Sequence, residues 1–246
     1  MDRMLYVTMA GAQQIMDTQS AIAHNLANAS TTGYRADTIS FKSLPLYGPG
    51  QPSRVYPISQ TSGVDTSTGT ISTTGRSLDV AVKGQGWIAV QAPDGSEAYT
   101  RAGNLKLTQT GQLLTGAGFP VMGNSGPIAI SQAQKLHIGG DGTISIRPAG
   151  QTAQALAVVD RIKLVNPDPS QMAKGPDGLM RLLGGGSAPA DAKVHVVSGA
   201  LESSNVNPVD AMVSMLALAR QYDMQVKLMQ TAKQNDAQSA QLMQVK

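Results

Sequence analysis

The sequence predicts a mainly β protein with a helix at each end. Apolar residues recur with a seven-residue period near both termini, over residues 5–29 and again from residue 208 onward. Between these ends the pattern changes to short alternating runs separated by turn residues. We therefore expect an antiparallel β-sandwich or barrel body and a coiled-coil-like pair formed by the N- and C-terminal helices.

The N-terminal helix is predicted from two lines of mostly small or apolar residues. One line holds Leu5, Ala12, Gln19 and Leu26, and the other holds Thr8, Ile15, Ile22 and Ala29. Residues 30–32 break the pattern and Gly33 follows in the C-cap region, so the helix should end near residues 28–30.

Two asparagines lie one turn apart just before this predicted end. Asn25 and Asn28 are poor interior helix residues at a spacing that shares one helix face. Either their amides bond locally to the fraying backbone, or they reach an adjacent helix and fix the register of an assembly.

The C-terminal helix has a clear start. Asn207 reads as the N-cap, Pro208 as the first-turn proline and Asp210 as the acid of the first turn. Its predicted seam is Met212, Met215, Ala219, Tyr222, Val226 and Met229, after which Lys233 and Asp236 occupy the seam. Such a helix would be about 55–60 Å long, too long for a small domain to cover, so its apolar stripe needs partners.

The central region reads as short strands divided by turns such as Asp94-Gly95, Asp141-Gly142 and Asp177-Gly178. The expected strands include residues 78–82, 87–90, 99–101, 105–107, 128–130, 144–146, 161–165 and 194–197. The domains expected are an N-terminal helix at 1–35, an extended Ser/Thr/Gly/Pro-rich connector at 36–77, a β-rich outer domain at 78–200 and a C-terminal helix at 201–246, with a mobile loop at 184–192.

The composition excludes several classes of protein. Charged residues make up only 14% of the chain, against about 25% in typical domains, and Lys and Arg are scattered singly, which does not favour nucleic-acid binding. There is no cysteine, no apolar run of a membrane span and no pattern of a cleaved signal peptide at the start. Because aromatics are only 4%, some apolar surface is expected to meet another chain.

No catalytic, metal or cofactor site is predicted. Gly84-Gln85-Gly86 leads into a strand and reads as a hairpin turn rather than a phosphate loop. His24, His137 and His195 are far apart, without metal-ligand spacing, and no nucleophile elbow occurs. Trp87 lies in an apolar run and is most simply a core residue.

Three separated motifs resemble the flagellar rod and hook protein family. They are NLANASTTGYR at 25–35, SLDVAVKGQGW at 77–87 with YTRAG at 99–103, and VSGALESSNVNPV at 197–209. They occur in the family's order and span nearly the whole chain. The Met1-Asp2-Arg3 start, the strand at Trp87, the run at 161–165 and the length favour the proximal-rod branch over the distal-rod branch.

The resemblance implies a structural subunit of the basal-body rod, not an enzyme, with no cofactor. It implies self-assembly through the terminal helices into a hollow torque-transmitting shaft that spans the periplasm, and export through the flagellar type III apparatus without a cleaved signal peptide. Its partners would be proximal and distal rod subunits, the rod cap and the export apparatus, with no nucleic acid and no membrane insertion. The helical ends are expected to order only on assembly, because each apolar stripe is exposed until a neighbour covers it.

The expected assembly interface combines the seam residues with nearby motif residues. It comprises Leu5, Ala12, Ile15, Ile22, Asn25, Leu26, Asn28, Gly33, Tyr34, Asn205, Asn207, Met212, Met215, Leu216, Ala219, Tyr222, Val226 and Met229. The alternatives are a distal rod subunit of the same family and a β-rich surface adhesin carried on a helical stalk; a peptidoglycan hydrolase lacks any visible acid-base pair.

Overall fold

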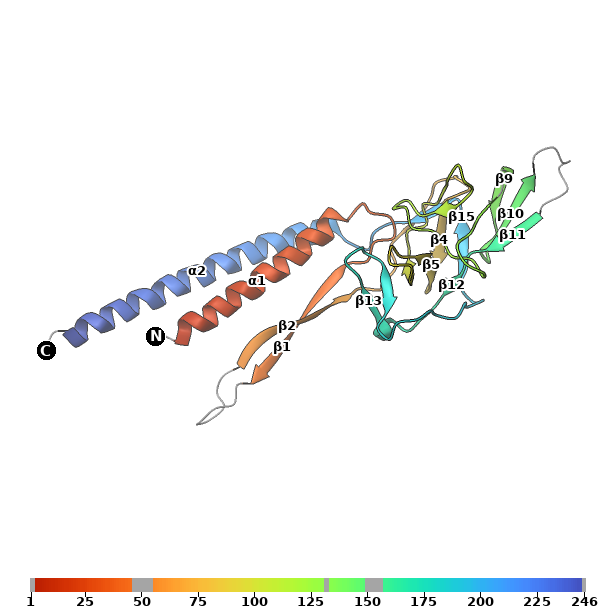
Figure 1. Ribbon diagram of the computed structural model, residues 1–246. Coiled ribbons are helices and arrows are strands. Elements are labelled where there is room, and N and C mark those ends of the chain that lie inside the picture. Colours follow the sequence, from red (N-terminus) through yellow and green to blue (C-terminus); the bar gives the residue numbers. More distant parts are fainter. Residues whose placement is uncertain (1–2, 46–54, 131–132, 149–156, 245–246) are drawn as a thin grey trace. The chain divides into compact units, whose positions relative to one another are not determined.

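The structure is a computed structural model that describes residues 3–45, 55–130, 133–148 and 157–244. These residues are mainly β, with one helix near each end, as predicted (Figure 1). They form two compact units. The first unit comprises Met1–Ala27, Asp37–Asp65 and Val206–Lys246, and the second comprises Asn28–Ala36 and Thr66–Asn205. No helix in the described part of the chain is long and apolar enough to cross a membrane.

Two helices lie side by side in the first unit (Figure 1): α1 (Arg3–Ala27) and α2 (Pro208–Gln244). In α1 the predicted seam faces inward, because Thr8, Ala12 and Ile15 are buried and Ile22 and Leu26 are half-buried.

In α2 only one of the two predicted lines is right. Met215, Tyr222 and Met229 are half-buried, as expected. The second line is Ala211, Leu218, Gln225 and Ala232, one residue earlier than the predicted line, in which Met212 and Ala219 are exposed and only Val226 is half-buried. Small residues allow this close approach: Ala232 is 1% exposed, and a Cβ atom added to Gly11 of α1 would lie 3.3 Å from the Gln225 amide nitrogen.

The start of α2 is capped as predicted. Asn207 Oδ1 accepts a hydrogen bond from the Val209 backbone N–H at 3.0 Å, and Asn207 Nδ2 donates to Asp210 Oδ2 at 2.6 Å. The end of α1 differs slightly from the expectation. The helix stops at Ala27, and Gly33, with a φ of 67°, lies six residues further on and so does not cap it.

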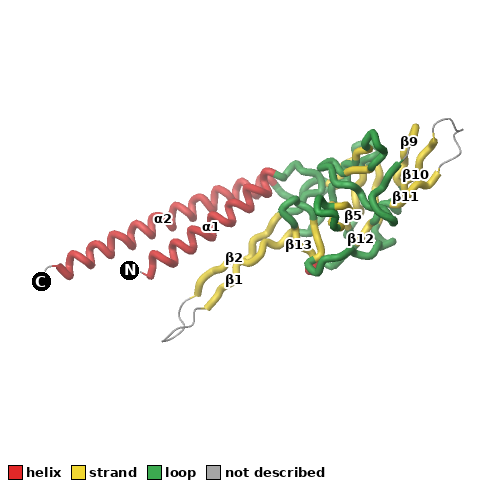
Figure 2. The backbone as a smooth tube through the Cα atoms, viewed as in Figure 1, coloured by secondary structure: helices red, strands yellow, loops and turns green. Residues whose placement is uncertain are grey.

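A long hairpin replaces much of the predicted connector at 36–77. β1 (Asp37–Pro45) pairs antiparallel with β2 (Val55–Val64) (Figure 2). β3 (Ile71–Thr73) pairs with β16 (Ala200–Glu202). The Ser- and Thr-rich composition obscured a two-residue alternation in which Ile39 and Phe41 are half-buried while their neighbours Thr38, Ser40 and Lys42 are exposed.

Short antiparallel strands form the second unit. A five-stranded sheet has the order β12 (Leu164–Val165), β5 (Trp87–Gln91), β6 (Glu97–Thr100), β14 (Met180–Leu182) and β13 (Met172–Lys174). A three-stranded sheet has the order β11 (Ala157–Arg161), β10 (Thr143–Pro148) and β9 (Ala133–Ile138). Two smaller sheets pair β15 (His195–Ser198) with β4 (Val80–Lys83) and β7 (Lys106–Leu107) with β8 (Leu113–Leu114). A short 3₁₀ helix, η1, spans Pro169–Gln171. No sheet among the described residues closes into a barrel.

Small aliphatic side chains fill the core of the second unit. Ile88, Val90, Leu105, Ile128 and Ile144 are fully buried within one apolar cluster. The predicted strand at 128–130 is not a named strand, although Ala129 forms an isolated bridge with Gln112. The other predicted strands overlap observed ones, except that the run at 161–165 contributes only Leu164 and Val165 to β12.

The turn at Gly84-Gln85-Gly86 is not the hairpin that the sequence predicts. The strands on its two sides belong to different sheets, since β4 pairs with β15 and β5 pairs with β12 and β6. A Cβ atom added to Gly86 would lie 2.6 Å from a methyl carbon of Val194. The turn therefore carries the chain from one sheet to the next through a space too narrow for a side chain.

The Asp-Gly turns agree with the prediction. Gly95 and Gly142 both have positive φ angles, and the preceding aspartates accept hydrogen bonds from residues two positions further on. Hydrogen bonds from Ser96 lower the pKa of Asp94, and those from Thr143 lower the pKa of Asp141. These carboxylates thus have a local structural role in their turns.

Candidate functional site

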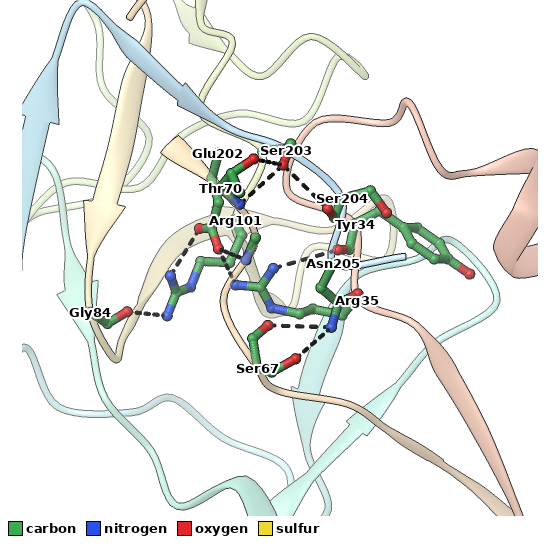
Figure 3. A network of polar contacts seen from close by, with 12 residues as sticks. Tyr34, Arg35, Ser67, Thr70, Gly84, Arg101, Glu202, Ser203, Ser204 and Asn205 are labelled. Carbon is green, nitrogen blue, oxygen red and sulfur yellow. Dashed lines mark hydrogen bonds and ion pairs between the residues drawn. The ribbon is translucent and has the colours of Figure 1, made fainter. Parts of the chain in front are cut away.

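A cluster of buried charges joins distant parts of the second unit around Glu202 (Figure 3). Glu202 Oε1 accepts hydrogen bonds from Arg35 Nη2 at 2.6 Å and from the Gly69 backbone N–H at 2.9 Å. Glu202 Oε2 accepts one from Arg101 Nη1 at 2.9 Å. The side chains of Arg35, Arg101 and Glu202 are 2%, 1% and 1% exposed, so this triad is closed to solvent.

Trp87 completes the cluster with an aromatic ring beside both arginines. The guanidinium carbon of Arg35 lies 5.8 Å from the ring centroid and that of Arg101 lies 5.4 Å from it, within the range of cation–π attraction. Arg101 Nη2 also donates to the Gly84 carbonyl at 2.7 Å. Trp87 is buried, as the sequence predicts, but its neighbours include charged groups as well as apolar ones.

Electrostatics explain why these groups occur together. Burial lowers the pKa of Arg101 and the neighbouring Arg35 lowers it further, while Glu202 opposes both effects. Two guanidinium groups share one carboxylate, so its removal would leave two buried cations without a counter-charge. Glu202 is thus the residue on which the cluster most depends.

Backbone contacts extend the cluster to the segment at 33–36. The Gly33 N–H donates to the Glu202 carbonyl at 2.8 Å, and the Ala36 N–H donates to Asn205 Oδ1 at 2.8 Å. A Cβ atom added to Gly33 would lie 2.3 Å from the Arg101 carbonyl carbon, so only glycine fits there. Residues of all three motifs therefore meet at one place in the second unit: Gly33 and Arg35, Trp87 and Arg101, and Glu202 and Asn205.

Three of the predicted interface residues, Gly33, Tyr34 and Asn205, thus have contacts inside the second unit. Tyr34 lies under Lys174, whose Nζ is 4.0 Å from the ring centroid and donates to the Arg35 carbonyl at 2.9 Å. Asn205 Nδ2 donates to the Ser67 hydroxyl at 3.2 Å. With Gly33, these residues tie the segment at 28–36 to the segment at 200–205.

The two asparagines of the α1 end also make contacts within the chain. Asn25 Nδ2 donates to the Asp37 carbonyl at 2.9 Å, and Asn25 Oδ1 accepts from the Asp37 N–H at 2.8 Å. His24 Nδ1 lies 2.7 Å from Asp37 Oδ2. Asn28 Oδ1 accepts from the Thr31 hydroxyl at 3.1 Å, a local contact. Asn25 therefore fixes the start of β1 beside α1 in the first unit.

The remaining predicted residues divide by exposure. Ala12 and Ile15 are buried in α1, and Ile22, Leu26, Met215, Tyr222, Val226 and Met229 are half-buried. Leu5, Asn207, Met212, Leu216 and Ala219 are exposed. Among the predicted residues, Leu5, Met212, Leu216 and Ala219 are therefore apolar side chains that this chain leaves exposed.

Sequence reasoning missed the role of Arg35, Arg101 and Glu202. They are separated by as many as 167 positions, so no local pattern joins them. A signal was nevertheless present, because each of the three motifs contains one charged member of the triad in a chain poor in charge. The described residues contain no group of three His, Asp or Glu side chains arranged to hold a metal ion.

Comparisons with known proteins place these features in a class. Residues 81–146 match a family model described as the flagellar hook protein FlgE/F/G D1 domain, and residues 197–242 match the flagellar basal body rod FlgEFG protein C-terminal model. Both descriptions concern rod and hook proteins of the bacterial flagellum. The first range includes Trp87 and Arg101, and the second includes Glu202 and nearly all of α2.

Full-length relatives make the assignment narrower. The flagellar basal-body rod protein FlgF of Escherichia coli K12 is 41% identical over 249 residues, covering 99% of each chain, and FlgF of Salmonella typhimurium LT2 is 39% identical with the same coverage. FlgG of Bacillus subtilis 168 is 32% identical over 94% of this chain and 95% of its own. The chain therefore belongs to the flagellar basal-body rod protein family, and it is more similar to these two FlgF proteins than to that FlgG.

Proposed function

We propose that this chain is a proximal-rod subunit whose two helices pack with helices of neighbouring subunits to build the hollow, torque-transmitting shaft. One observation carries the proposal. At the start of α2, Val209, Met212, Val213 and Leu216 are 66%, 54%, 62% and 64% exposed, although another face of the same helix is already packed on α1. A cluster of this kind on a monomer surface marks a contact with another protein.

The helix pair would act as a coiled-coil-like stem within that shaft. Its seam supports this geometry, because Met215, Tyr222 and Met229 recur every seven residues and face α1. The short strands of the second unit would form the sandwich-like outer domain. Helices that order fully only against neighbouring subunits would also explain the exposed apolar residues.

The family supports a location in the flagellar basal body, and the proposal extends this to a shaft that crosses the periplasm. Rod subunits, the rod cap and the flagellar export apparatus would be the partners, and export would proceed without a cleaved signal peptide. The buried triad holds the fold together and offers no group for catalysis. A distal-rod role is less well supported, because the FlgG similarity is lower than the FlgF similarity.

A deletion tests the proposal and separates it from the adhesin alternative. Removal of residues 207–246 removes α2 but leaves Glu202 and its arginines in place. In cells that lack their own proximal-rod protein, the full chain should restore swimming and enter basal bodies, whereas the shortened chain should do neither. Trp87 fluorescence of the purified shortened chain checks that the second unit remains folded. Motility restored by the shortened chain would contradict the proposal.

A point substitution with a matched control sharpens the test. Leu216→Ser changes an α2 side chain that is 64% exposed, and Leu183→Ser makes the same change at a loop position that is 68% exposed. Both substitutions should leave the fold intact, because neither side chain is buried. Only Leu216→Ser should reduce swimming and recovery in basal bodies. Equal behaviour of the two variants would count against a specific helix surface.

A further inference from the structure

A loop crosses the outer edge of the five-stranded sheet, where β12 is the last strand beside β5. The Lys163 carbonyl, just before β12, accepts a hydrogen bond from the Ala89 N–H of β5 at 3.0 Å. Because successive carbonyls of an extended strand point to opposite sides, the Leu164 carbonyl points away from β5. It accepts a hydrogen bond from the Asp191 N–H at 2.8 Å. Residues 187–191, which we term the strap, therefore cover the edge of β12 at this carbonyl.

A buried hydroxyl holds the other end of the strap. The Ala188 N–H donates to the Tyr99 hydroxyl at 2.7 Å, and the two residues are 3% and 0% exposed. Tyr99 in turn donates to Glu97 Oε1 at 3.0 Å, and Lys163 Nζ donates to both oxygens of the same carboxylate at 2.9 and 2.8 Å. Because the carboxylate accepts the Tyr99 proton, the hydroxyl oxygen presents its lone pairs to the Ala188 N–H.

The chain on both sides of the strap is exposed. Three consecutive glycines at 184–186 precede it, and a Cβ atom added to any of them would meet no atom within 4 Å. Two of them have φ angles of 69° and 84°, a conformation that glycine adopts without steric cost. After the strap, Ala192 and Lys193 are exposed before the chain enters the core at Val194, which is 3% exposed. The strap can therefore pivot on these segments and take only the Ala188 side chain out of the core.

The strap is packed loosely against the sheet edge. A hollow of about 340 Å³ is lined by Ala190 and Asp191 of the strap and by Asn166, which follows β12. A hollow of about 200 Å³ is lined by the same two strap residues and by Ile162, which precedes β12. Apart from Ala188, the residues of the strap are exposed or half-buried. Two hydrogen bonds, rather than a large apolar contact, therefore hold the strap in place.

We propose that the strap opens as one segment while the rest of the second unit stays folded, and that the Tyr99 hydroxyl is the latch that keeps it closed. Opening breaks the hydrogen bonds of Ala188 and Asp191 and uncovers the outward-facing backbone of β12. An uncovered edge strand is a template for pairing with a strand of another chain, and the closed strap prevents this pairing. The inference concerns the second unit alone and goes beyond the proposed rod function.

Thiol labelling measures the opening, because the chain has no cysteine of its own. Ala188→Cys places a buried thiol on the strap, and Ala98→Cys places one in β6, at a residue that is 0% exposed. In the full-length chain, the first thiol should react roughly tenfold faster than the second, because opening of the strap requires less free energy than unfolding of the unit. Urea midpoints show whether the added sulfur has changed the stability of either variant. Equal labelling rates at equal stability would overturn the proposal.

Tyr99→Phe tests the latch, and Thr115→Val is its matched control. Each change removes a buried hydroxyl that accepts a backbone N–H, from Ala188 in the first case and from Phe119 at 3.1 Å in the second. Combined with Ala188→Cys, Tyr99→Phe should raise the labelling rate roughly tenfold, the factor expected for one buried hydrogen bond. Thr115→Val should change that rate by less than about twofold, because it does not contact the strap. Equal rates in the two combined variants would refute the role of Tyr99.

Hydrogen exchange of the chain without added cysteines shows whether the opening uncovers β12. The Ala188 and Asp191 amides should have similar protection factors, both lower than that of the Ala89 amide, which is bonded inside the sheet. Tyr99→Phe should accelerate exchange at both strap amides. An Asp191 amide that stays as protected as Ala89 while the Ala188 amide exchanges would overturn the proposal, because the edge of β12 would then remain covered.

Discussion

Glu202→Gln should destabilise the second unit more than any other single polar substitution in the cluster. The change keeps the shape of the side chain and removes the carboxylate that Arg35 and Arg101 both contact. Those guanidinium groups are almost completely buried, and removal of one partner from a buried ion pair typically costs about 3–5 kcal/mol. Against a total stability of about 5–15 kcal/mol, this is a large fraction.

Urea unfolding followed by fluorescence measures this loss. Trp87 is the only tryptophan and lies beside both arginines, so its emission reports on the second unit alone. With an m value of about 2 kcal/mol per molar urea, the midpoint should fall by about 1.5–2.5 M. Arg35→Met should cost less, because Glu202 would keep Arg101 as its partner.

A second carboxylate provides the control for this reasoning. Glu97 pairs with Lys163 at 2.8 Å, but their side chains are 10% and 16% exposed, so water partly compensates for a lost charge. Glu97→Gln should therefore cost clearly less than Glu202→Gln. A loss below about 1 kcal/mol for Glu202→Gln, or equal losses for the two variants, would refute the account of the cluster.

Three further predictions concern single positions in the two units. Gly33→Ala should destabilise the second unit by more than about 1 kcal/mol, because the added Cβ atom would clash with the Arg101 backbone. Gly75 has a similar φ, but a Cβ atom added there would meet no atom within 4 Å, so Gly75→Ala should lose only the free energy of backbone strain. The urea midpoints of the two variants should therefore differ. Asn25→Ala should expose the Asp37 amide, at a cost of about 1–3 kcal/mol, and unchanged hydrogen exchange at Asp37 would contradict this. Burial raises the pKa of Tyr99 to about 12, above its unfolded value of about 10. The free energy of unfolding should therefore be unaffected by this group below pH 10 and should fall as the pH rises from about 10 to 12. The Tyr99→Phe variant should not show this fall.

Capping residues and the seven-residue apolar period made the two helices predictable from the sequence. They did not predict which of two neighbouring rows of α2 residues packs on α1. Asn207 and Pro208 signal the start of α2 by capping geometry alone, and the structure confirms it. The predicted seam runs through Met212, whereas in the structure Ala211 is half-buried and Met212 is exposed, because close helix contact favours the smaller residue. Met212 and Ala219 remain exposed, which is the property expected of a surface that meets another chain.

Long-range pairing explains what the sequence did not predict in the β regions. The hairpin of β1 and β2 lies in a Ser- and Thr-rich stretch whose alternation is weak, and its strands are defined by each other. The Glu202 triad depends on three segments that meet only after folding. The three motifs could be recognised in the sequence. That they place Arg35 and Arg101 on the Glu202 carboxylate follows only from the folded structure.

A side-chain-resolution map of the basal body, from cells that carry this chain as their proximal-rod protein, tests the central claim most directly. The account predicts density for this chain in the rod, with α1 and α2 of each copy packed against helices of neighbouring subunits and Leu216 covered. A rod in which the neighbours of this chain contact only its second unit, with both helices surrounded by solvent, would contradict it.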